Sequence, residues 1–107
     1  MDNSLKQKIK NTIESSTIVR TGGDMGRIFY HVIGRDGNII GELSEPVGGF
    51  GYYRVLINGV EPIQVQWRPE YPYLGNAISD IRAAHADVSE LLDVCKHKIA
   101  LQSQRTK

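Results

Sequence analysis

The three histidines and the single cysteine are the side chains of this 107-residue chain best suited to bind a metal or to catalyse a reaction. His85 and His97 fall on one predicted helix, about 18 Å apart along its axis, which is too far for both to hold one metal ion. No group of Cys and His residues has the spacing of a zinc site. We therefore expect neither a metal centre nor a cofactor.

Catalysis by side chains alone has equally little support in the sequence. His31 lies opposite Glu42 in a predicted hairpin, where cross-strand neighbours approach to about 5 Å and could exchange a proton. Opposite charges often face each other on exposed strands, so a structural role for this pair is the favoured interpretation. Cys95 lies on the apolar stripe of a predicted helix, which indicates a buried, unreactive thiol. No serine has the neighbours of a nucleophile elbow, so an enzyme is not predicted.

The stretch Gly48–Trp67 is predicted to form a β-hairpin, because runs of β-branched and aromatic residues flank Asn58-Gly59. A three-residue connection that ends with Gly59 in the left-handed conformation separates apolar from polar side chains, whereas a two-residue turn mixes them. One face then carries Tyr52, Arg54, Gln64, Gln66 and Arg68. The other carries Tyr53, Val55, Ile63, Val65 and Trp67, which predicts that Trp67 is buried and Gln66 is not. Pro62 lacks an N–H donor and places the second strand at a sheet edge.

A second hairpin is predicted around Arg35-Asp36-Gly37-Asn38, which has the composition of a two-residue type I′ turn. Pairing of Arg35 with Asn38 divides the flanking strands into two faces. The core face carries Ile28, Tyr30, Val32, Ile39 and Leu43. The face that continues the polar side of the other hairpin carries Phe29, His31, Ile33, Ile40 and Glu42.

Helical periodicity is found at both ends of the chain. An apolar stripe of Leu5, Ile9 and Ile13 predicts a short helix from about Ser4 to Ser15. Lys6, Lys8 and Lys10 surround this stripe and are interpreted as a solvated face rather than a basic patch. A stripe from Ile78 to Ile99 predicts a helix from Leu74 to about Leu101, with a break near Ala86 as the alternative. The polar tail, residues 102–107, is expected to fray.

Together these elements predict a single α+β domain over residues 1–107. A four-stranded antiparallel meander is expected, with a short N-terminal helix and a long C-terminal helix packed on one sheet face. A brief strand over Thr17–Arg20 is also compatible with the sequence. No apolar run approaches the roughly 20 residues that span a bilayer, and the first ten residues lack the apolar region of a secretory signal. With a single cysteine, the chain is expected to be cytoplasmic and not to bind membranes.

The polar sheet face is the best candidate for function. Its mixture of rings, guanidinium groups and amides is typical of surfaces that recognise a protein. The residues expected to bind a partner are Tyr52, Arg54, Gln64, Gln66, Arg68, Phe29 and His31. The first hypothesis is therefore a small non-enzymatic interaction module, as a stand-alone inhibitor or adaptor. It would bind a protein partner or a second copy of itself.

The alternative is a nucleic-acid-binding domain. Between Gly48 and Leu92, a meander followed by a helix, with Tyr52, Arg54, Gln64 and Arg68 projecting, resembles the AP2-type DNA-binding domains of plant regulators and phage integrases. The resemblance is architectural, includes no diagnostic motif, and implies that the open sheet face would contact DNA. A formal net charge of +1 weighs against this alternative, because phosphate binding depends on an excess of basic side chains.

Overall fold

The computed structural model describes residues 1–22, 26–48, 51–67 and 76–105. The elements are α1 (Asn3–Glu14), β1 (Thr17–Gly22), β2 (Arg27–Ile33), β3 (Ile39–Pro46), β4 (Gly51–Ile57), β5 (Ile63–Trp67) and α2 (Asn76–Arg105). Each strand pairs with the next along the chain, which gives an antiparallel meander in the order β1-β2-β3-β4-β5. The α+β architecture is confirmed, but the sheet has five strands rather than four, because Thr17–Gly22 pairs along its whole length with β2.

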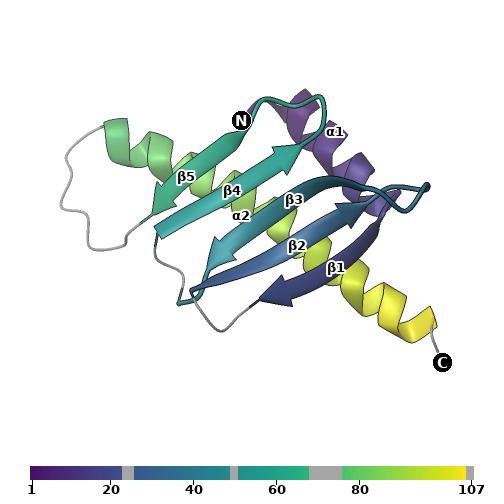
Figure 1. The fold of residues 1–107 in the computed structure, drawn as a ribbon. Coiled ribbons are helices and arrows are strands. Elements are labelled where there is room, and N and C mark those ends of the chain that lie inside the picture. The colour runs from purple at the N-terminus through teal and green to yellow at the C-terminus, as the bar shows by residue number, and fades with distance from the viewer. Residues whose placement is uncertain (23–25, 49–50, 68–75, 106–107) are drawn as a thin grey trace.

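Both helices pack on the same side of the sheet, and no described helix or strand covers the opposite side (Figure 1). α1 runs parallel to α2, as three successive contacts show. Lys6 Nζ lies 3.1 Å from a carboxylate oxygen of Asp87, Lys10 forms an ion pair with Glu90, and Lys98 Nζ donates to the backbone carbonyl of Glu14 at 2.6 Å. Two of the lysines beside the α1 stripe therefore face carboxylates of α2 and do not form a basic patch.

The core lies between the sheet and the two helices. Alternate residues of the strands point into it: Ile18, Tyr30, Val32, Leu43, Tyr53, Val55, Ile57 and Val65. The helices contribute Ile9, Ile13, Val88, Leu91, Leu92 and Cys95. Burial of these side chains is the main force that holds the helices on the sheet.

The second hairpin has the predicted faces. Tyr53 pairs with Val65, Arg54 with Gln64 and Tyr52 with Gln66, and Gly59 has a φ of +81°. Residues 58–62 connect the strands, so the connection is longer than the predicted three residues. A change of two residues preserves the side-chain alternation, which is why the predicted faces remain correct. The side chain of Trp67 and all of Arg68 lie outside the described residues.

The first hairpin differs from the predicted type I′ turn. Gly34, not Arg35, pairs with Asn38, and the Gly34 N–H donates to the Asn38 carbonyl at 2.8 Å. A type I′ turn would require positive φ at Asp36, whereas here only Gly37 has it, at +85°. The Asp36 carboxylate instead accepts hydrogen bonds from the backbone and side chain of Asn38.

A bulge in β3 then restores the predicted register. Ile33 pairs with Ile39, but Val32 pairs with Gly41, so one residue of β3 is extra, and His31 is opposite Glu42 as predicted. The bulge reverses the predicted roles of two isoleucines. Ile39 was assigned to the core but is 61% exposed, whereas Ile40 was assigned to the open side but packs against the core.

α2 is continuous from Asn76 to Arg105, with no break near Ala86. It continues past the predicted end at Leu101, so residues 102–105 are helical rather than a frayed tail. Gln102 is held by the backbone of Ile18 in β1 through two hydrogen bonds of 2.8 Å. This tertiary contact explains why a polar segment stays in the helix.

Candidate functional site

The uncovered side of the sheet is called the open face below. It consists of Val19, Thr21, Arg27, Phe29, His31, Ile33, Glu42, Ser44, Tyr52, Arg54, Leu56, Gln64 and Gln66. The strand register arranges these side chains in rows across the sheet. One row runs Thr21, Phe29, Ser44, Arg54, Gln64, and the next runs Val19, His31, Glu42, Leu56.

Arg54 is held in one of these rows by a side chain of the neighbouring strand. Its Nε and Nη2 donate to Gln64 Oε1 at 3.2 Å and 3.0 Å. Among the described residues, its Nη1 group has no acceptor, so this part of the guanidinium remains available to a ligand. Tyr52 lies on the same strand and is 42% exposed. The arrangement combines a fixed cation with an accessible ring.

Arg27 joins the two halves of the open face. Its Nη2 donates to Ser44 Oγ on β3 and to the Tyr52 carbonyl oxygen on β4, both at 2.9 Å. The side chain therefore reaches from β2 across β3 to β4, and Ser44 is only 2% exposed. The predicted site residues did not include Arg27, although the alternation that placed Phe29 and His31 on this face also places Arg27 there.

His31 forms its hydrogen bond with β1 rather than with β3. Its Nε2 lies 3.0 Å from Thr21 Oγ1, and its ring stacks near that of Phe29, with centroids 6.3 Å apart and planes 19° apart. Glu42 is the register neighbour of His31, but no hydrogen bond or ion pair joins the two side chains. The register places the two residues as predicted, but the expected pairing of their opposite charges is not seen.

The structure brings most of the predicted site residues onto one surface. Tyr52, Arg54, Gln64 and Gln66 are immediate neighbours on β4 and β5. Phe29 and His31 lie two strands away, about 10 Å across the sheet. Arg27 bridges that gap, whereas Arg68 lies outside the described residues. Val19 was missed because the fifth strand was not counted in the sheet.

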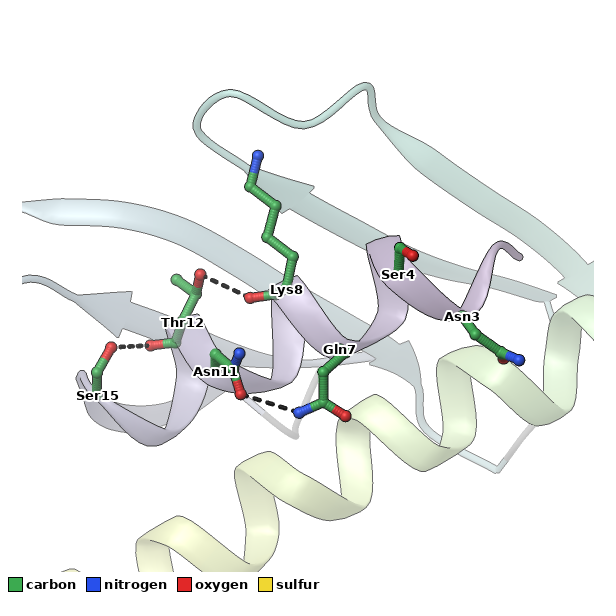
Figure 2. Close-up of a pocket in the computed structure, with 7 residues that line it drawn as sticks. All are labelled: Asn3, Ser4, Gln7, Lys8, Asn11, Thr12 and Ser15. Atoms are coloured by element: carbon green, nitrogen blue, oxygen red, sulfur yellow. Dashed lines mark hydrogen bonds between the residues drawn. The ribbon is translucent and has the colours of Figure 1, made fainter.

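Another hollow lies away from the open face, along the outer surface of α1 (Figure 2). It has a volume of about 690 Å³ and is lined by Asn3, Ser4, Gln7, Lys8, Asn11, Thr12 and Ser15. Several of these groups satisfy one another, since Gln7 Nε2 donates to Asn11 Oδ1 at 2.9 Å and Thr12 Oγ1 donates to the Lys8 carbonyl at 3.0 Å. Ligand pockets are mostly apolar, so this hollow is a solvated helix surface.

The remaining groups to consider are the buried thiol and the side chains able to bind a metal. Burial raises the pKa of the Cys95 thiol to about 12, so it stays protonated and unreactive near neutral pH. Within the described ranges, no three His, Cys, Asp or Glu side chains are placed to share a metal ion. Neither helix, in its described part, has the length and apolar character to span a membrane.

Comparison with known proteins adds no information about function. No protein-family model matches the sequence, and no significant match is found among curated proteins or solved structures.

Proposed function

We propose that this protein is a non-enzymatic interaction module whose open face binds an acidic surface of a protein partner. The observation that carries the proposal is the pair of arginines held on the open face, where Tyr52 is exposed and the rings of Phe29 and His31 are partly exposed. Arg27 is fixed by Ser44 and the Tyr52 backbone, and Arg54 by Gln64. Because contacts within the protein already orient both guanidiniums, binding would cost less side-chain entropy.

The composition of the open face favours a protein over nucleic acid. Arginine and aromatic residues are typical of the residues that dominate protein–protein binding energy. Val19 is 41% exposed, and Ile33 and Leu56 are partly exposed, which adds apolar area to the same surface. A phosphate backbone would need more cations than Arg27 and Arg54, and Glu42 lies among them.

A protein partner also fits better than a second copy of this chain. Two arginines and one glutamate give the described open face a basic balance, so two such faces brought together would repel each other. A small domain that acts by binding alone serves as an inhibitor or adaptor, and we place its action in the cytoplasm. A single cysteine that is buried and free is consistent with a reducing compartment.

The test is site-specific photo-crosslinking in the native host, with the reactive group at position 66 on the open face or at position 7 on α1. A protein captured from position 66 alone, with or without nuclease, supports the proposal. Capture that disappears with nuclease would favour nucleic acid, and capture of the chain itself would favour a homodimer. Equal capture from both positions would place the site elsewhere.

The affinity of variants for the captured protein then tests whether Tyr52 and Arg54 contribute to binding. The double substitution Tyr52→Ala with Arg54→Ala should weaken binding about 30-fold, or about 2 kcal/mol, if these side chains form a hot spot. Arg82→Ala, an exposed arginine of α2, is the matched control and should leave binding unchanged. Circular dichroism checks that both variants are folded. Unchanged binding by a folded double variant would contradict the proposal.

A further inference from the structure

A pocket of about 250 Å³ lies at one end of the open face, between the bulge of β3 and the connection from β4 to β5. Its walls are mostly apolar and include Ile39, Ile40, Leu56, Ile57, Val60 and Pro62. The backbone N–H of Asn58 donates to the Ile40 carbonyl at 2.9 Å and ties the connection to β3. The pocket is therefore framed by backbone contacts and not only by side chains.

Gly41 allows the two strands to approach closely beside this pocket. A Cβ atom at this position would lie 2.5 Å from Ile57 Cδ1 and 2.8 Å from the Leu56 carbonyl oxygen. Any larger residue would force β3 and β4 apart. The pocket thus depends on both the bulge, which turns Ile39 outward, and the glycine that follows it.

Glu42 is the one ionisable side chain of the pocket lining. It is half-buried, and no cation or hydrogen-bond donor among the described residues contacts its carboxylate. A carboxylate that is partly removed from water gains stability from an incoming cation. The neighbouring His31 forms its hydrogen bond with Thr21 and not with this carboxylate.

We propose that this pocket binds one arginine side chain of the partner protein. The aliphatic stem would pack along Leu56 and Val60, and the guanidinium would bind the carboxylate of Glu42. The pocket is smaller than the roughly 300–1,000 Å³ of small-molecule sites and suits a single side chain. The inference rests on the proposed function, since it adds a basic anchor to an interface in which Arg27 and Arg54 meet acidic groups.

The test uses small probes in place of the partner. Isoleucine methyl groups are labelled for NMR, and the protein is titrated with N-acetyl-argininamide, N-acetyl-leucinamide or methylguanidinium. Saturable shifts of the Ile39 and Ile57 methyls are expected with the arginine probe. The apolar probe and the guanidinium head alone should each bind about five-fold more weakly, because each lacks half of the contact.

Two further measurements test whether the charge of the Glu42 carboxylate contributes to binding. Glu42→Gln should weaken binding of the arginine probe about five-fold, whereas Asp93→Asn, which removes an exposed carboxylate of α2, should not. With the wild-type protein, added salt should weaken the arginine probe and leave the leucine probe unaffected. Equal affinity for the arginine and leucine probes would overturn the inference. So would an affinity for the arginine probe that changes neither with added salt nor with Glu42→Gln. The open-face variant Tyr52→Ala with Arg54→Ala is tested against the partner, so either proposal can fail alone.

Discussion

Gln102 of α2 forms two hydrogen bonds with the backbone of Ile18 in β1. Its Nε2 donates to the Ile18 carbonyl oxygen, and its Oε1 accepts from the Ile18 N–H, both at 2.8 Å. β1 is an edge strand, and the register places Ile18 opposite Val32 of β2. The amide therefore occupies a pair of backbone groups that an edge strand would otherwise present to another chain.

Substitution of this glutamine should destabilise the protein. We expect Gln102→Ala to lower the free energy of unfolding by about 1–2 kcal/mol, because two hydrogen bonds are lost. Gln104→Ala, on an exposed position of the same helix, should change it by less than about 0.5 kcal/mol. Urea denaturation measures both values. Equal effects of the two substitutions would show that the contact to Ile18 contributes nothing.

Arg27 is predicted to stabilise the sheet as well as to bind the partner. Arg27→Met keeps the aliphatic stem but leaves the buried Ser44 hydroxyl and the Tyr52 carbonyl without their donor, which should cost about 1–2 kcal/mol. The control is Arg35→Met, at an exposed position in the first hairpin. Thermal unfolding followed by circular dichroism compares the two. A melting temperature unchanged by Arg27→Met would rule out this stabilising role.

The contact between α1 and α2 should weaken in acid. The α-amino group of Met1 and the ammonium of Lys6 lower the pKa of Asp87, and Lys10 lowers the pKa of Glu90. A carboxylate with a lowered pKa contributes stability above its unfolded pKa and loses it as the pH falls, so the decline is expected between about pH 5 and pH 3. Urea midpoints across this range should fall less for Asp87→Asn than for wild type. An equal decline of the urea midpoint in both proteins would show that Asp87 does not contribute to the acid sensitivity.

Cys95 should contribute packing without reactivity. Cys95→Ala is expected to cost on the order of 1 kcal/mol of unfolding free energy, since the side chain is fully buried. A bulky thiol reagent should label the native protein only as fast as it unfolds. Rapid labelling at neutral pH would show that the thiol is accessible. Binding of the partner should be unaffected by the substitution.

Cys95 also predicts a loss of stability in alkali. Its pKa is raised from 9.0 to about 12 in the folded protein. The folded state therefore holds this proton more tightly, and stability should decline as the pH rises above about 9, by up to about 1.4 kcal/mol per unit. Cys95→Ala should decline less steeply over the same range, as measured by urea midpoints. Identical slopes would contradict the raised pKa.

Side-chain alternation was sufficient to predict the faces of the second hairpin. Tyr53 and Val65 are buried and Tyr52 is exposed, as the pattern around Asn58-Gly59 indicated. The lengths of the connections were less predictable, because a shift of two residues leaves the alternation unchanged. The bulge at Ile40 could not be recognised either, since it compensates for the shift in the turn and leaves His31 opposite Glu42.

Contacts between distant parts of the chain account for the other differences. β1 is short and mostly polar, and its place in the sheet depends on pairing with β2 and on Gln102, which lies 84 residues away. No local sequence pattern indicates such a contact. Arg27 was overlooked for a different reason. Its position on the open face follows from alternation, but its reach to Tyr52 requires the arrangement of three strands.

The order of the elements along the chain determines when the core can close. All five strands precede α2, and its residues Leu91, Leu92 and Cys95 complete the core. During translation the strands therefore leave the ribosome before the helix that covers most of their apolar side. Nascent chains with exposed apolar surface are prone to aggregate and are typical clients of chaperones. The arrival of α2 ends this vulnerable interval, which makes the last third of the chain decisive for successful folding in the cell.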